Sequence, residues 1–437
     1  MSQHVSRTAT LMVVCTAHFL MPFMMSAVGV ALPAIGRDFN ASAMQLGLVE
    51  TSYVLSASIF LLAMGRMGDI HGRRKVFQYG IVAFTVAGGL LSQAWSIESM
   101  IVMRFLQGMG GSMVMATTFA IVVSVFPPEE RGKALGIAVA SVYAGISCGP
   151  FIGGALVNAF GWRSIFYLAV PLGAITFATS CAKLRGEWAE SRGEPFDWRG
   201  SLVYAAAILM LITGASNLDQ GWWAWALTAG GVAGLAHFLI LEARTEYPVL
   251  NVNLLRNNRV FAFSNLAALL NYAATFGVTF FLSLYLQYVK GLNPREAGTI
   301  LILQPIIQAI FSPLCGRLAD RFSAPAVATI GMGLCATGLG IAATITAASP
   351  ITLVLGTLVT LGLGFALFSS PNISVIMGSI PTRYLGVASG LNSIFMGGQA
   401  VTLQTQGLFL DSMRTALLTF SALCCIGIFF SFGRILK

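Results

Sequence analysis

The chain has 437 residues, of which 56% are hydrophobic and only 9% are charged. A soluble domain has roughly a quarter charged residues, so this composition excludes a soluble protein and indicates a membrane protein with many spans. The net charge of +9 would suggest a nucleic-acid partner in a soluble chain, but here the cations gather in loops between apolar runs, so topology explains them and we expect no nucleic-acid binding.

Apolar runs of about 20 residues recur along the chain, and each is long enough to cross a bilayer as a helix. They predict an all-α integral membrane protein with about 14 transmembrane helices. The predicted spans are 11–36, 46–65, 76–95, 99–126, 134–159, 164–183, 200–218, 222–241, 260–289, 297–316, 325–347, 351–371, 385–409 and 415–434. Lys and Arg concentrate in alternate loops, which predicts an even number of helices and places both termini in the cytoplasm.

The first span has four side chains that are candidates for lining a substrate cavity. Methionine is flexible and polarisable, so a methionine-rich wall accommodates ligands of varied shape, although plain packing is the more common role of such a helix face. The candidates are His18, Met21, Met24 and Met25.

Glu50 is the one carboxylate that falls clearly within a predicted span. An acid inside a membrane is costly and is by default a functional hypothesis. In the span 99–126, Arg104 and Gln107 lie on one helical stripe, and Arg104 is about as far from its outer helix end as Glu50. We therefore expect Glu50 to pair with Arg104 and to carry the coupling proton; the alternatives are a purely structural pair, or a Glu50 that lies in the outer interface. Tyr53 and Gln107 are further cavity candidates.

A polar island at 65–75, with the sequence GRMGDIHGRRK, separates the second and third spans. One acid lies there among four cations, and three glycines allow a sharp turn between two helices. This spacing resembles the loop between helices 2 and 3 of major facilitator superfamily transporters; a generic positively charged loop is the alternative. The resemblance implies that the acid holds a neighbouring helix terminus and stabilises one conformation of a carrier. The motif residues are Gly65, Gly68, Asp69, Gly72, Arg73 and Arg74.

The span 134–159 has glycines at four-residue spacing, which make a smooth face for a second helix. The pattern G-x-x-x-G-P-x-x-G-G resembles the helix 5 signature of the superfamily's antiporters, and ordinary packing of small residues is the alternative. Its residues are Gly145, Gly149, Pro150, Gly153 and Gly154.

The second half of the chain faintly repeats the first. Gly316, Asp320 and Arg321 echo the 65–75 motif, which predicts two six-helix bundles with an inserted helix pair. The predicted domains are an N-terminal bundle at 1–184, a linker with the inserted helices at 185–258, and a C-terminal bundle at 259–437. Four amides could contact a polar ligand or, as the slightly favoured alternative, neighbouring helices. They are Gln304, Gln308, Asn392 and Gln399.

No phosphate-binding loop, zinc-protease motif or hydrolase elbow occurs in the sequence. The seven cysteines lie in apolar runs without metal-ligand spacing. We therefore expect no enzymatic activity, no metal and no cofactor.

The whole chain resembles the fourteen-helix drug:proton antiporter branch of the superfamily. This resemblance implies the export of small hydrophobic or amphipathic compounds in exchange for protons, by a monomer in a prokaryotic inner (plasma) membrane. The expected partners are the small-molecule substrate, protons and membrane lipid. Met24 stands where that branch usually has an acid, so an uncoupled or differently coupled facilitator is the first alternative. A receptor or scaffold that transports nothing is the second.

Overall fold

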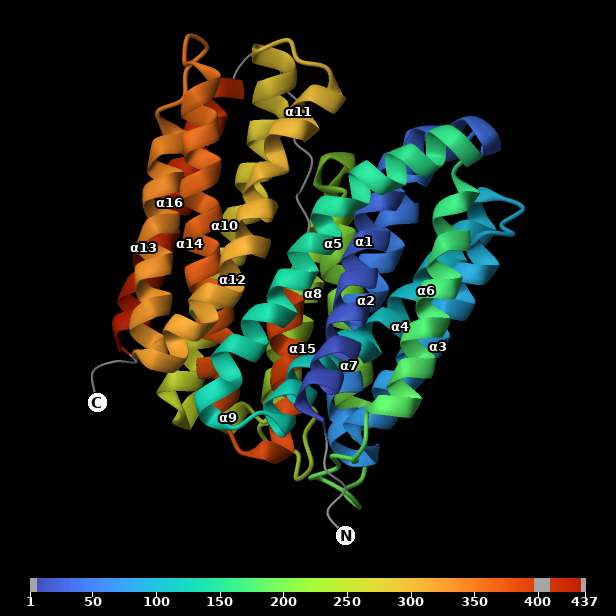
Figure 1. Ribbon diagram of the computed structural model, residues 1–437, viewed down its shortest axis with the longest axis vertical. Helices are drawn as coiled ribbons and strands as arrows, with labels where there is room; N and C mark the ends of the chain where they lie inside the picture. The colour runs from blue at the N-terminus through green and yellow to red at the C-terminus, as the bar shows by residue number, and fades with distance from the viewer. Residues whose placement is uncertain (1–5, 397–408, 434–437) are drawn as a thin grey trace. The chain divides into compact units, whose positions relative to one another are not determined.

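The computed structural model describes residues 6–396 and 409–433, which form sixteen α-helices joined by turns and loops (Figure 1). The helices are α1 (Arg7–Phe39), α2 (Ala43–His71), α3 (Arg73–Leu91), α4 (Ile97–Val125), α5 (Arg131–Phe160), α6 (Arg163–Lys183), α7 (Trp198–Ala215), α8 (Trp222–Glu242), α9 (Val252–Asn257), α10 (Arg259–Leu284), α11 (Pro294–Leu301), α12 (Leu303–Arg321), α13 (Ala324–Ala343), α14 (Ile351–Gly378), α15 (Leu385–Met396) and α16 (Phe409–Gly433).

Local sequence signals explain where several of these helices begin. Ser42 starts α2 in a capping box with Gln45, in which each side chain bonds to the backbone N–H of the other residue. Gly72, between α2 and α3, has a φ of 113°, a conformation that residues with a side chain rarely adopt. Glycine at this position therefore lets the chain turn and begin α3 immediately.

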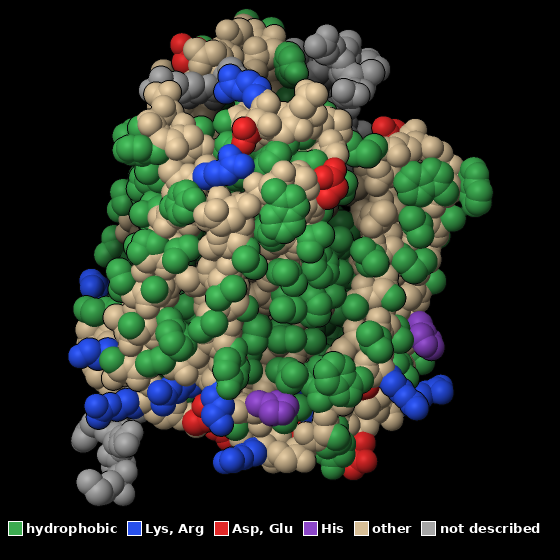
Figure 2. All heavy atoms as spheres, turned by 90° about the vertical axis from the view of Figure 1, so that its right-hand side faces the viewer, with side chains coloured by type: hydrophobic (Ala, Val, Ile, Leu, Met, Phe, Trp, Pro, Cys, Tyr) green, Lys and Arg blue, Asp and Glu red, His purple; other side chains and the backbone are tan. Residues whose placement is uncertain are grey.

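Twelve helical segments of the described part are long and apolar enough to cross a membrane. The predicted spans 76–95 and 385–409 are not among these twelve, so fourteen transmembrane helices are not shown. The predicted span 76–95 corresponds to α3, which begins with Arg73, Arg74 and Lys75, and these residues lower the mean hydropathy of the helix. The predicted span 385–409 includes residues outside the described ranges. On the face in Figure 2, the charged side chains gather mainly toward the two ends and apolar ones cover much of the band between. The chain is thus an all-α, multi-pass membrane protein.

The described helices pack into two compact units. The first contains residues 6–126, 145–257 and 380–396. Within it α4 packs along α2 and α3, α6 lies against α1 and α3, α7 pairs with α8, and α15 lies against α2 and α4. The second contains residues 127–144, 258–379 and 409–433, with α13 packed on α14 and α16, α12 on α14, and α10 on α16. The domain boundaries predicted from the sequence stay a prediction.

Candidate functional site

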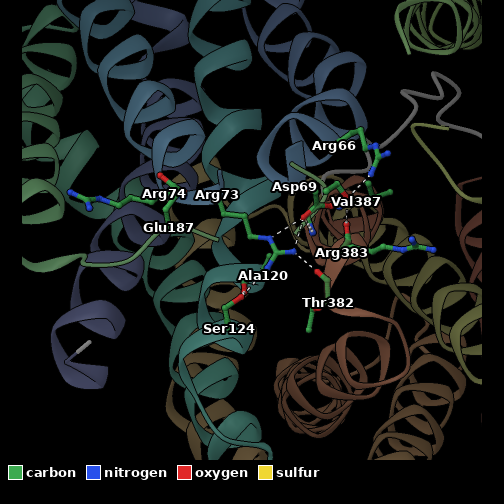
Figure 3. A network of polar contacts seen from close by, with 12 residues as sticks. Arg66, Asp69, Arg73, Arg74, Ala120, Ser124, Glu187, Thr382, Arg383 and Val387 are labelled. Carbon is green, nitrogen blue, oxygen red and sulfur yellow. Dashed lines mark hydrogen bonds and ion pairs between the residues drawn. The ribbon is translucent and has the colours of Figure 1, made fainter. Parts of the chain in front are cut away.

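Asp69, near the end of α2 in the first unit, caps the start of α15 (Figure 3). The backbone N–H of Gly386 donates to Asp69 Oδ1 at 3.0 Å, and that of Val387 donates to Oδ2 at 3.3 Å. The first N–H groups of a helix have no partner within the helix and carry partial positive charge, so a carboxylate is a favourable acceptor for them. We call Asp69, Arg73 and the start of α15 the Asp69 clamp.

Arg73 supplies the counter-charge in the Asp69 clamp. Both side chains are fully buried, and Arg73 Nε and Nη2 donate to Asp69 Oδ1 at 2.9 and 2.7 Å. Arg73 also donates to Ser124 Oγ at 2.9 Å and to the carbonyl oxygen of Thr382, shortly before α15. Removing one partner of a buried ion pair leaves an uncompensated charge and costs about 3–5 kcal/mol. The acid, the guanidinium and the helix start therefore depend on one another for stability.

Glycines let α2 approach α15 closely enough for this clamp. A side chain on Gly65 would meet the carbonyl carbon of Gly386 at 2.8 Å, and one on Gly386 would meet Asp69 Oδ1 at 2.8 Å. A side chain on Gly68 would meet Thr117 Cγ2 of α4 at 3.0 Å. Any larger residue at Gly65 or Gly386 would separate the two backbones and break the hydrogen bonds to Asp69.

Residues 187–194, which the sequence predicts only as part of a linker, bind the basic motif. Arg66 is buried, donates to Ser191 Oγ at 3.0 Å and forms an ion pair with Glu194. Glu187 Oε1 accepts a hydrogen bond from the backbone N–H of Arg74 at 3.0 Å. The acidic residues of this linker could have predicted these contacts, because buried cations require counter-charges.

The second unit contains a matching arrangement, which we call the Asp320 clamp. Asp320, near the end of α12, accepts hydrogen bonds from the backbone N–H groups of Gly132 at 2.7 Å and Lys133 at 2.8 Å, at the start of α5. Ser370 Oγ donates to the carbonyl oxygen of Gly132 at 3.0 Å. Gly316 lies so close to Gly132 that neither has room for a side chain. Each sequence half thus supplies one acid that caps a helix of the other half, as an internal repeat predicts.

The two clamps differ in charge compensation. Asp69 is fully buried and paired with Arg73, whereas Asp320 is half-buried and takes part in no ion pair among the described residues. Arg321, a residue of the predicted motif, is exposed. Among the described residues, the Asp320 clamp therefore rests on hydrogen bonds without an ion pair, whereas the Asp69 clamp also includes a buried ion pair.

Arg104 is fully buried in α4, within the first unit. Its Nε donates to the carbonyl oxygen of Val49 at 3.2 Å, and its Nη1 donates to Gln107 Oε1 at 2.8 Å. The guanidinium carbon lies 4.5 Å from the ring centroid of Tyr53, at cation–π distance. Glu50, roughly two turns into α2, is half-buried and interacts electrostatically with Arg104. No ion pair of the described residues joins these two side chains.

Two side-chain donors of α4 have no acceptor among the described residues. Arg104 Nη2 and Gln107 Nε2 are both buried, and neither has a partner in the described part of the chain. An unsatisfied buried donor costs about 1–3 kcal/mol, and more when it is charged. These atoms are therefore available to an acceptor on Glu50 or on a bound ligand.

The glycine face of α5 packs directly on α1 in the first unit. A side chain on Gly149 would meet Ser26 Cβ at 2.6 Å, and one on Gly153 would meet Ala27 Cβ at 2.8 Å. Gly145 likewise faces the carbonyl oxygen of Phe19 without room for a side chain. Gly154 is less tightly packed, because the atom nearest to a side chain added there, Val30 Cγ1, would lie 3.7 Å away. Pro150 lies within the same helix.

The remaining cavity candidates are distributed over both units. In α1, His18 packs edge-on against Phe119 at 4.9 Å between ring centroids, Met21 and Met24 are buried, and Met25 is half-buried. Asn392 is buried in α15, Gln304 and Gln308 are buried in α12, and Gln399 lies outside the described residues. The α12 amides belong to the second unit and the other described candidates to the first, so neither unit contains the whole predicted set. Among the described residues, no group of His, Cys, Asp and Glu could hold a metal ion.

Comparison with known proteins identifies relatives over most of the chain. The sequence model of the Major Facilitator Superfamily matches residues 14–403. The riboflavin transporter RibZ of Clostridioides difficile is 31% identical over 379 residues, which are 86% of this chain and 82% of RibZ. The multidrug resistance protein Stp of Mycobacterium tuberculosis is 32% identical over 397 residues, which are 89% of this chain and 73% of Stp.

The solved structures include a neighbour with the same fold. The crystal structure of the human organic anion transporter MFSD10 superimposes with a TM-score of 0.70, covering 98% of this chain and 99% of the other, at 13% sequence identity. At this identity the likeness shows the fold alone.

Proposed function

The chain belongs to the Major Facilitator Superfamily of secondary transporters, which are not enzymes, and on that premise we propose that it exports small hydrophobic or amphipathic organic compounds in exchange for protons. The relatives support a small organic cargo, because RibZ is a riboflavin transporter and Stp a multidrug resistance protein. The first span contributes Met21 and Met24, whose adaptable side chains suit such ligands.

The proposal includes the fourteen-helix branch of the superfamily. In this proposed arrangement, α3 and the segment 385–409 supply the two spans beyond the twelve candidates, and α7 and α8 form the inserted pair. We place the protein in a bacterial plasma membrane, with both termini in the cytoplasm, because Lys and Arg concentrate in the loops on that side.

The observation that carries the proton coupling is the buried Arg104 with its free donor beside Glu50. Proton binding to Glu50 removes the negative charge near the guanidinium, and Arg104 Nη2 and Gln107 Nε2 are then the donors for an acceptor atom of the substrate. Proton release restores the charge and competes with that substrate atom. A transporter that responds in this way binds the proton and the substrate in alternation, as antiport requires.

The Asp69 and Asp320 clamps supply the conformational part of the proposal. Each holds a helix start in this conformation, so each must release it for alternating access to proceed. Breaking both clamps costs free energy, which differential binding of protons and substrate must offset.

Replacing Glu50 by glutamine tests the proton coupling. We expect proteoliposomes with a trapped pH-sensitive dye to show proton movement driven by a lipophilic cation or a neutral drug in the wild type, and at least about a tenfold smaller signal in the variant. Glutamine keeps the size and polarity of the side chain but cannot release a proton. The matched control is Asp219→Asn, because Asp219 is exposed near the end of α7 and should leave coupling unchanged.

A facilitator that moves its substrate without protons is the second candidate, and the buried Met24 favours it. This residue stands where antiporters of the branch usually have an acid, and it is fully buried in α1. Substrate movement that generates no proton signal in the wild type, and is unchanged in Glu50→Gln, would establish the facilitator and leave Glu50 as a structural neighbour of Arg104.

A further inference from the structure

Two acidic side chains of the inserted helix pair meet at the base of that pair, in the first unit. Asp197 is the N-cap of α7, and its Oδ1 accepts a hydrogen bond from the backbone N–H of Gly200 at 2.9 Å. Glu242 is the last residue of α8, is only 2% exposed, and its Oε2 accepts from the backbone N–H of Leu250 at 2.7 Å. Each carboxyl group thus uses one oxygen to fix a backbone segment.

The two remaining oxygens face each other without a donor. Glu242 Oε1 and Asp197 Oδ2 are buried, and neither receives a hydrogen bond from any N–H or O–H group in the described part. Both lie against Gly200, where a side chain would come within 2.5 Å of Asp197 Oδ2 and would overlap Glu242 Oε1. No ion pair of the described residues includes either acid.

Two ionised carboxylates in this arrangement are strongly unfavourable. Like charges that share a buried site repel, and each buried charge also loses its hydration without a compensating donor. A single proton removes both problems, because an O–H···O⁻ hydrogen bond between carboxyl groups is short and strong. We propose that Asp197 and Glu242 form a proton-binding site, in which one proton is held between Glu242 Oε1 and Asp197 Oδ2. This site is independent of the role proposed for Glu50.

Among the described residues, no cation forms an ion pair with either acid and so takes the place of that proton. Asp197 is the titratable side chain that faces Glu242, and the connector after α8 offers the backbone N–H groups of Val249 and Leu250. Of the charged residues nearest in sequence, Arg199, Arg244 and Glu246 are exposed, whereas Glu194 is half-buried and forms an ion pair with Arg66.

The other elements around the connector contribute apolar side chains to a shared cluster. α2 supplies Ile59 and Leu62, and α15 supplies Val387. The hydroxyl group of Tyr204, from α7, donates to the carbonyl oxygen of Ser58 at 3.2 Å and is thereby occupied. The proton is therefore the ligand that this site can take from solvent.

The site is connected to the Asp69 clamp through the chain after α8. Glu242 fixes the backbone at Leu250, and the next residue, Asn251, donates from Nδ2 to the hydroxyl oxygen of Tyr384 at 3.0 Å. Tyr384 immediately precedes α15, whose first N–H groups bind Asp69. Loss of the shared proton drives Glu242 away from Asp197, loosens Leu250 and so weakens the support of the clamped helix start.

The pH dependence follows from the charge of the pair. The shared proton is bound at low pH and is lost as the pH rises, so the stability contributed by the pair falls with increasing pH. Glu242→Gln and Asp197→Asn each put an amide N–H in the place of the shared proton, and asparagine also retains the N-cap hydrogen bond. Both variants should behave as permanently protonated forms.

The test compares the wild type with both amide variants in detergent. We expect the infrared spectrum of the wild type to contain a protonated-carboxyl band that is lost as the pH rises, and both variants to lack this band. The melting temperature of the wild type should fall over the same pH range, while those of the variants stay constant. The control is Glu246→Gln, an exposed acid four residues after Glu242, which should retain the wild-type band and melting curve. A wild-type spectrum that is unchanged in both amide variants would overturn the proposal, as would a wild-type melting curve that depends on sodium instead of pH.

Amide hydrogen exchange tests the connection to the clamp. At a pH high enough to remove the wild-type infrared band, Glu242→Gln should exchange more slowly than the wild type at Leu250, Gly386 and Val387. Slower exchange at Leu250 alone would contradict the connection to α15. Because neither readout involves transport, these outcomes do not depend on whether the protein proves to be a proton antiporter.

Discussion

Asp69→Asn is expected to lower the transport rate at least about tenfold, because it leaves Arg73 buried without a counter-charge. Asparagine can accept hydrogen bonds through one oxygen only, so the N–H groups of Gly386 and Val387 can no longer each bind a separate oxygen. The loss also removes a negative charge from the start of α15. Uptake into proteoliposomes measures the rate, and the melting temperature of the purified protein reports the accompanying loss of stability.

Asp320→Asn is the matched comparison, because Asp320 also binds two backbone N–H groups but takes part in no ion pair among the described residues. We expect its loss of stability to be clearly smaller, about 1–2 kcal/mol against about 3–5 kcal/mol for Asp69→Asn. Equal losses in the two variants would mean that Arg73 contributes nothing to the clamp.

Gly149→Ala is expected to have the second large effect, because α1 and α5 are packed backbone to backbone at this position. The added methyl group would lie 2.6 Å from Ser26 Cβ and 3.0 Å from the backbone nitrogen of Ala27, so the helices must separate. Separation also stretches the hydrogen bond from Ser26 Oγ to the carbonyl oxygen of Ile146, now 3.0 Å long. Such overpacking costs about 1–3 kcal/mol, and we expect a lower melting temperature together with impaired transport.

Gly154→Ala provides the control within the same motif. The nearest atom to its added methyl group is Val30 Cγ1 at 3.7 Å, an ordinary van der Waals distance. This variant should retain the wild-type melting temperature and transport rate. If Gly154→Ala is as damaging as Gly149→Ala, helix flexibility at the glycines, and not contact with α1, would explain the motif.

The sequence was sufficient to predict those features that depend on local spacing. Glycines at four-residue intervals indicated a close helix contact, and the structure places Gly149 and Gly153 against α1. The resemblance of the 65–75 motif implied that an acid binds a helix terminus, and Asp69 caps α15. The functional roles of these residues stay predictions.

Other features depend on how loops fold back on the helices, which no periodic pattern records. The contacts of Arg66 with Ser191 and Glu194 join residues more than a hundred positions apart, and the latter two lie in a stretch without helical spacing. The meeting of Asp197 with Glu242 likewise depends on how α7 pairs with α8. The count of fourteen spans is not shown, because Arg73, Arg74 and Lys75 belong to α3 itself and because 385–409 includes residues outside the described ranges.

Both clamps bind peptide N–H groups, which every residue except proline possesses. Substitution on α15 or α5 by a residue other than proline therefore leaves the donors in place, and the size constraint at each helix start applies to tightly packed residues such as Gly386 and Gly132. Positions of these helices that are not packed this tightly, unlike Gly149 and Gly153 of α5, can change without affecting the clamps. Clamps that bind only the backbone therefore allow the substrate-contacting residues to diverge while the conformational change itself is retained.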